Sequence, residues 1–254
     1  MDFNLSVTDT VINDVAQEYM GELGVWTGFT RRLVFAHNTV CRTNWGSMSF
    51  GGGGGKWRTG NETYQGQNEV SWNRFSHWML TLCDSGATYF LGPHPNSSHH
   101  HNHCVQGGSG IEPDSGHSTS AHGGAWYTDS GSAYWDIHSN VAEQLNGGMW
   151  MTAWDPATTH HLAVHGNFAD TTNYKMIATD SVFFNNTFVN RSAGELWPTA
   201  ATTVREGAGV RAGSALPEAL HACDNSVKSY VPQSGCSALP IEAFKPDAAD
   251  DYGY

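Results

Sequence analysis

Short apolar or alternating runs, separated by Gly, Asn, Asp and Pro, make up most of the chain. The runs lie at residues 33–36, 78–82, 87–91, 133–137, 149–154, 174–178 and 182–189. Runs of this length and punctuation indicate β-strands. Asp84-Ser85-Gly86, between two of the runs, has the composition of a hairpin turn. No internal repeat stands out and strands do not alternate with helices, so the pattern predicts a mostly β protein built as a β-sandwich or jelly roll.

The first 30 residues contain the best helical pattern. Within residues 10–23 (TVINDVAQEYMGEL), Val11, Val15 and Tyr19 recur at i, i+4 and i+8, and Gly24 follows as a stop signal. We therefore expect a short helix in an N-terminal segment, residues 1–30, followed by a β domain over residues 31–222.

The last part of the chain, residues 223–254, has a different composition. Pro232, Pro240 and Pro246 interrupt it, and it ends in a cluster of aspartates before Tyr254. Spaced prolines without hydrophobic periodicity favour an extended segment. The sequence predicts a C-terminal arm that lies on its own domain or on a neighbouring subunit.

Charge is scarce and predominantly negative. Charged residues make up 14% of the chain, compared with about 25% in an average soluble protein. The net charge is −12, and the twelve Lys and Arg residues are scattered. This disfavours nucleic acid and anionic membrane surfaces as partners, because both need clustered basic residues. No apolar run approaches the ~20 residues of a membrane span, so we expect no membrane insertion, and the N-terminus lacks the features of a secretory signal.

Histidines concentrate in a polar stretch over residues 93–122, which we expect to form a long exposed loop. Side chains of an extended segment alternate between faces, so His99, His101 and His103 would share one face. Imidazole pairs at i, i+2 suit Zn or Cu, which makes these three the candidate metal ligands. The alternative is a solvated polar loop without a metal.

Aromatic residues cluster between residues 126 and 154. Trp and Tyr rings can stack on sugar rings, and Trp126 and Tyr127 are the candidate glycan-binding residues. The alternative is that the aromatic residues of these strands belong to the core. No motif identifies a catalytic group, and the catalytic residues therefore remain unassigned.

Five cysteines, an odd number, are spread widely along the chain: Cys41, Cys83, Cys104, Cys223 and Cys236. This is not the spacing of a disulfide framework. Cys223 and Cys236 could close a small loop, or all five could be reduced thiols.

Residues 147–223 resemble the distal part of β-sandwich proteins found in the particles of tailed bacteriophages. The resemblance covers about a third of the chain. It rests on a strand that ends in Asp155-Pro156 and on the segments 202–205 and 213–216. The chain has Pro217 and Glu218 where the family pattern has an aromatic-Gly ending. The resemblance implies a structural virion protein of the tail or of a surface projection.

Three functional hypotheses follow. The first is a structural subunit of a large assembly, a bacteriophage virion, with other subunits as partners and a part in host attachment. The second is a glycan-binding module or glycan-active enzyme, virion-borne or extracellular, whose partner is a host-surface glycan. The third is a metal-dependent β-fold enzyme that uses the histidine stretch.

Overall fold

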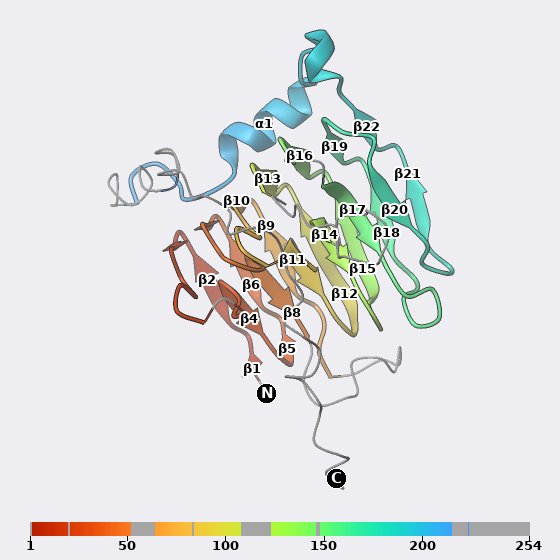
Figure 1. Ribbon diagram of the computed structural model, residues 1–254. Helices are drawn as coiled ribbons and strands as arrows, with labels where there is room; N and C mark the ends of the chain where they lie inside the picture. The colour runs from red at the N-terminus through yellow and green to blue at the C-terminus, as the bar shows by residue number, and fades with distance from the viewer. Residues whose placement is uncertain are drawn as a thin grey trace, which may run out of the picture.

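The protein winds into a parallel β-helix, in which three parallel sheets run side by side along one axis (Figure 1). This computed structural model describes residues 2–19, 21–51, 64–82, 84–107, 123–145 and 148–214, together with Cys223. Successive coils contribute a strand to each sheet in turn, so a strand inside a sheet pairs with the equivalent strands of the coils before and after it. Such a solenoid buries its core between stacked coils rather than between facing sheets.

The strands are short and follow the same order in successive coils. The first sheet contains β2 (Ser6–Thr8), β6 (Val34–Ala36), β9 (Glu69–Ser71), β12 (Pro93–His100), β15 (Ala133–His138), β18 (Ala163–His165) and β21 (Val182–Phe184). The second sheet contains β3 (Val11–Asn13), β7 (Thr39–Cys41), β10 (Arg74–Ser76), β13 (His103–Val105), β16 (Val141–Glu143), β19 (Phe168–Ala169) and β22 (Thr187–Phe188). The third sheet contains β4 (Val25–Thr27), β8 (Met48–Phe50), β11 (Ser85–Phe90), β14 (Gly123–Thr128), β17 (Met149–Ala153) and β20 (Tyr174–Met176), and β1 (Asp2–Phe3) pairs separately with β5 (Thr30–Arg31).

The predicted β-sandwich or jelly roll is wrong, although the protein is mostly β. Every strand pair in the described residues is parallel, whereas a sandwich would pair sequence neighbours in antiparallel fashion. The expected hairpin at residues 84–86 illustrates the difference. Ser85 begins β11, which pairs with β8 one coil earlier and β14 one coil later.

The predicted helix at residues 10–23 is also wrong. Val11 begins β3, which pairs with β7, and Asp14 and Ala16 have positive φ angles of 51° and 60°. Those angles lie in the left-handed region, which stops a right-handed helix. The helices of the described residues lie near the other end of the chain, as a 3-10 turn at Arg191–Ala193 and α1 (Thr199–Gly207). Neither is long and apolar enough to cross a membrane.

The histidine-rich stretch is not a continuous loop. Residues 93–100 form β12 and residues 103–105 form β13, while residues 108–122 lie outside the described residues. The predicted C-terminal arm also lies outside them, apart from Cys223. A disulfide joins Cys223 to Cys41 of β7, in place of the suggested pair with Cys236, and Cys104 is a buried free thiol. Cys83 and Cys236 are not among the described residues.

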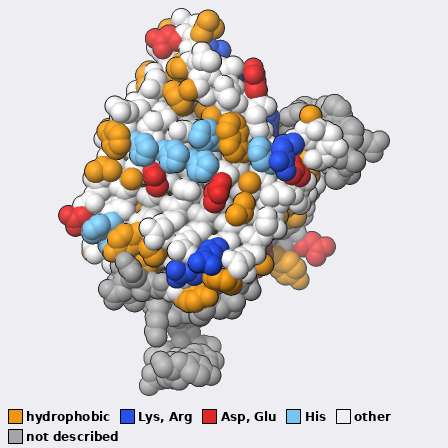
Figure 2. All heavy atoms as spheres, turned by 180° about the vertical axis from the view of Figure 1, so that it is seen from behind, with side chains coloured by type: hydrophobic (Ala, Val, Ile, Leu, Met, Phe, Trp, Pro, Cys, Tyr) orange, Lys and Arg blue, Asp and Glu red, His pale blue; other side chains and the backbone are white. Residues whose placement is uncertain are grey.

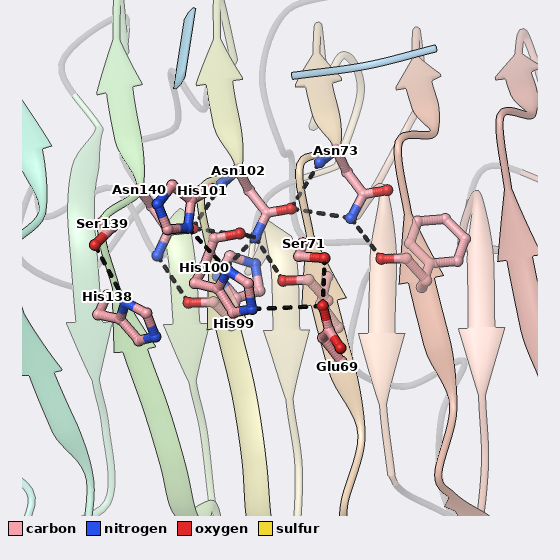
Figure 3. A network of polar contacts seen from close by, with 12 residues as sticks. Glu69, Ser71, Asn73, His99, His100, His101, Asn102, His138, Ser139 and Asn140 are labelled. Atoms are coloured by element: carbon pink, nitrogen blue, oxygen red, sulfur yellow. Dashed lines mark hydrogen bonds and ion pairs between the residues drawn. The ribbon is translucent and has the colours of Figure 1, made fainter. Parts of the chain in front are cut away.

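A ladder of asparagines marks the turn between the first and second sheets. Asn73 donates through Nδ2 to Oδ1 of Asn102 over 2.9 Å, and Asn102 donates to Asn140 over 3.0 Å (Figure 3). Each amide also donates to a backbone carbonyl of the preceding coil, as Asn102 does to Val70. The full ladder is Asn38, Asn73, Asn102, Asn140, Asn167 and Asn186. These bonds satisfy buried polar groups that would otherwise be costly.

The residue before each ladder asparagine has a left-handed backbone. Its φ angle lies between 53° and 62° at His37, Trp72, His101, Ser139, Gly166 and Asn185. This conformation turns the chain sharply from one sheet to the next and aims the asparagine inward. Apolar side chains then stack in columns inside the coils, for example Val40, Phe75 and Cys104, which are paired in register and wholly buried. The core is therefore continuous along the axis.

Helix α1 lies against the outer face of the second sheet, beside β10, β13 and β16 (Figure 1). Its buried residues Ala201 and Val204 pack with Val141, Val189 and Trp197 in a small second cluster. The chain then continues back toward the first coils. Gly209 donates its backbone N–H to Trp72 and Arg211 forms an ion pair with Asp9.

The ladder predicts a position-dependent loss of stability. Replacing Asn102 by Ala would leave the buried carbonyl of Val70 and two N–H donors of Asn73 without this partner. Each buried unsatisfied group costs roughly 1–3 kcal/mol, so the free energy of unfolding should fall by about 3 kcal/mol. The matched control is Asn186→Ala, at the half-buried end of the ladder, which should cost less. Equal losses in denaturant unfolding would contradict the structural role of the ladder.

Candidate active site

One face of the β-helix gathers histidines and carboxylates. In the first sheet, Val70, His99, Ile137 and Val164 share one register and point into the core, so the residues flanking them point outward. The outward set includes Glu69, His100, Asp136, His138 and His165, which we call the histidine band. Figure 2 shows a band of histidine side chains across one face of the molecule, with acidic side chains beside it.

The imidazole rings of the band are stacked along the axis. Ring centroids of His100 and His138 lie 5.0 Å apart with planes 12° from parallel, and those of His138 and His165 lie 5.2 Å apart at 9°. Phe184 continues the stack at 4.9 Å. Neighbouring strands are about 4.8 Å apart, so identical register imposes this spacing on the rings. Ring faces contact one another, while His100 Nδ1 lies 2.9 Å from His101 Nδ1 and His138 Nδ1 lies 3.1 Å from Ser139 Oγ.

Each carboxyl group of the band has a polar partner on the same face. Ser71 Oγ donates to Glu69 Oε1 over 2.8 Å, and His100 Nε2 lies 3.6 Å from the same oxygen (Figure 3). His165 Nε2 lies 2.9 Å from Asp136 Oδ1. The two carboxyl side chains remain 46% and 48% exposed, so a ligand can reach both.

The imidazoles at the centre of the band favour the neutral form. Burial lowers the pKa of His100, although Glu69 and Asp136 oppose the effect. Burial also lowers the pKa of His138, and so do its neighbours His100 and His165, while Asp136 raises it. A neutral imidazole has one donor and one acceptor nitrogen, which suits hydroxyl groups.

The two carboxyl groups belong to strands that are two positions apart. Glu69 pairs in register with Ser98, and Ser98 with Asp136, so about 9.6 Å separates the two backbones at twice the interstrand spacing. Inverting glycoside hydrolases hold their carboxyl groups roughly 6.5–9.5 Å apart, which leaves room for a water molecule. The backbone spacing of Glu69 and Asp136 lies close to the upper end of that range.

A second ring stack borders the band at the left-handed turns. Trp72 lies between His37, at 6.0 Å, and His101, at 4.7 Å, with nearly parallel planes. Burial, followed by the neighbouring His100 and His138, lowers the pKa of His101 to about 4. The rings of His37, Trp72 and His101 thus continue the row of stacked rings toward the first coils.

The three histidines predicted as metal ligands do not share a face. His99 points into the core, where Nε2 lies 2.9 Å from Thr88 Oγ1. His101 occupies the left-handed turn and His103 belongs to the second sheet, with Nε2 2.8 Å from Glu143. The alternation on which the prediction depended ends at His100, because the chain turns at His101. No cluster of three or more His, Cys, Asp or Glu side chains suited to a metal occurs within the described ranges.

The two residues predicted to bind glycan lie in the third sheet and are buried. Trp126 is 0% exposed and contacts Trp150, and Tyr127 is 2% exposed with its hydroxyl donating to Asp84. Neither ring presents a free face for stacking on a sugar. The sequence does not single out Glu69 or His138 of the histidine band, because only pairing between coils brings them beside His100, Asp136 and His165.

Comparisons with known proteins bear on the fold. No protein family model matches the chain, and no curated protein is significantly similar in sequence. A solved structure described as a glycoside hydrolase is similar, with a TM-score of 0.57 and 20% identity over 85% of this chain. The chain spans 29% of the length of that structure. At this identity the similarity supports the fold alone.

Two histidines inside the coils predict acid sensitivity. Burial lowers the pKa of both His94 and His99 from 6.5 to about 3. Between these values the unfolded chain binds protons that the folded chain does not, so the free energy of unfolding falls as the pH falls. The slope is about 1.4 kcal/mol per pH unit for each histidine.

The double variant His94→Gln/His99→Gln should therefore unfold with a shallower dependence on pH across this window. The exposed His161→Gln is the control and should keep the slope of the parent protein. Denaturant unfolding at a series of pH values measures both. An unchanged slope in the double variant would show that these two imidazoles do not control acid stability.

Proposed function

We propose that this protein is glycan-active and that the histidine band binds and hydrolyses a polysaccharide. One observation carries the proposal: Glu69 and Asp136 project from the same exposed sheet face, two strands apart, each beside a histidine of one continuous ring stack. The similarity to a structure described as a glycoside hydrolase supports it. The low charge content and the many aromatic residues are also typical of glycan-binding proteins.

The reaction needs two carboxyl groups in complementary roles. One donates a proton to the oxygen of the departing sugar while the other takes a proton from water. The water oxygen attacks the anomeric carbon as the glycosidic bond breaks, which leaves a new reducing end of inverted configuration. The two-strand spacing of Glu69 and Asp136 is compatible with a water molecule between the sugar and the second carboxyl group.

The imidazoles supply binding and orientation. His138 Nε2 and His165 Nδ1 make no hydrogen bond within the described residues and can bond sugar hydroxyls, while the ring faces stack on one another. The stack also fixes the rings before a ligand arrives, which reduces the entropy lost on binding. His165 orients Asp136 through the 2.9 Å contact, and Ser71 orients Glu69.

Hydrolysis should depend on both carboxyl groups. The isosteric variants Glu69→Gln and Asp136→Asn should each lower kcat by roughly 10²–10⁴-fold, which is the usual contribution of a general acid or base. Both positions are about half exposed, so the melting temperature should change little. Release of reducing ends from a panel of neutral and acidic polysaccharides measures the activity.

The control is Glu22→Gln, which changes an exposed carboxyl group outside the band. It should retain full activity. Binding of the same polysaccharides should persist in Glu69→Gln and Asp136→Asn. If the parent protein neither binds nor cleaves any member of the panel, or if the two variants cleave as the parent does, the proposal is wrong.

The expectation of a structural role in a virion, in contact with other subunits, stays a prediction. This expectation is compatible with the proposed role of the histidine band, because a subunit of a particle can also act on a glycan. The native mass of the protein in solution tests it, since an assembly component should form species larger than one chain.

A further inference from the structure

A cavity of about 320 Å³ lies on the outer face of the second sheet, next to α1. It is separate from the histidine band, which belongs to the first sheet. Its lining is almost wholly polar: Arg74, His103, Val105, Gln106, Glu143, Gln144, Arg205 and Glu206. A polar cavity of this volume can hold one small ligand.

Register and helix position assemble this lining. Arg74 pairs with His103 across β10 and β13, and Val105 pairs with Glu143 across β13 and β16. Gln106 and Gln144 follow these strands at left-handed turns, with φ angles of 57° and 58°. Helix α1 adds Arg205 and Glu206 from the side. The cavity therefore depends on the same coil register as the rest of the fold.

Glu143 is the central acceptor. Its side chain is 6% exposed, and Oε1 receives both His103 Nε2, at 2.8 Å, and Arg205 Nε, at 2.9 Å. Burial opposes its ionisation, but these two hydrogen bonds outweigh the effect and lower its pKa to about 2. Oε2 accepts no hydrogen bond within the described part of the chain. Oε2 is not among the buried unsatisfied oxygens of the described residues, so it is open to the cavity and can accept a hydrogen bond from a ligand there.

The other groups define the class of that ligand. Two arginines and two glutamates line the cavity, so their formal charges cancel and a charged ligand gains no net attraction. Arginines donate, glutamates accept and the two glutamine amides do both. The hydroxyl groups of a sugar ring match this lining, because each can both donate and accept a hydrogen bond and the ring holds several of them on a compact frame. We propose that this cavity binds a single neutral sugar residue, as a second site that does not depend on the histidine band.

The test uses methyl glycosides of a neutral hexose, a hexosamine and a hexuronate as probes. Saturation-transfer difference NMR on the full chain should show millimolar binding of the neutral hexoside, about −4 kcal/mol at 1 mM. The double variant Gln106→Ala/Gln144→Ala should weaken this binding at least tenfold. Both side chains are exposed, so folding should be unaffected, which a melting curve checks.

Two controls separate the sites. Gln17→Ala removes an exposed glutamine of the first coils and should leave binding unchanged. Asp136→Asn alters the histidine band and should also leave binding unchanged, whatever it does to hydrolysis. Three results would overturn the proposal: no saturation transfer to any probe at millimolar concentration, binding only of the hexosamine or hexuronate, or equal affinity in Gln106→Ala/Gln144→Ala.

Discussion

The asparagine ladder is the constraint from which the other features of this protein follow. A buried amide must be hydrogen-bonded, and each ladder asparagine achieves this only when the next coil places its own asparagine directly above. The ladder thereby fixes the register of every coil at the turn between the first and second sheets. A slip of one residue would exchange inward and outward side chains and bury the polar positions. Core columns such as Val40 and Phe75 depend on that register, and so do the surface rows.

Register converts a short sequence pattern into an ordered row of side chains on the surface. Because the residue two positions before each ladder asparagine points outward, His100, His138 and His165 become a continuous stack, although they are far apart in sequence. Stacking partly buries the rings and keeps the central imidazoles neutral. The same alignment brings Glu69 and Asp136 to one face. The imidazoles and the two carboxyl groups therefore lie together on this face. The cavity beside α1 is built by the same coils on another face.

Much of the strand content could be predicted from the sequence, but the architecture could not. The runs at residues 87–91 and 133–137 coincide with β11 and β15, because apolar character and turn residues act locally. Parallel pairing one coil away leaves no local signal. The parallel pairing is encoded by a short repeated motif, which is an asparagine that follows a turn residue and has apolar residues on either side. The motif recurs at intervals that vary from 19 to 38 residues. Such irregular spacing hides the repeat. The expectation that His99, His101 and His103 share one face is wrong for another reason, because the left-handed turn at His101 ends the alternation of the strand.

The most direct test of this account follows the histidine side chains by NMR during titration with a neutral oligosaccharide. If the histidine band is the binding surface, the imidazole resonances of His100, His138 and His165 should shift together and saturate with one affinity. Those of His94 and His99, enclosed in the coils, should not move. Saturable shifts that leave the three band histidines unaffected would contradict the account.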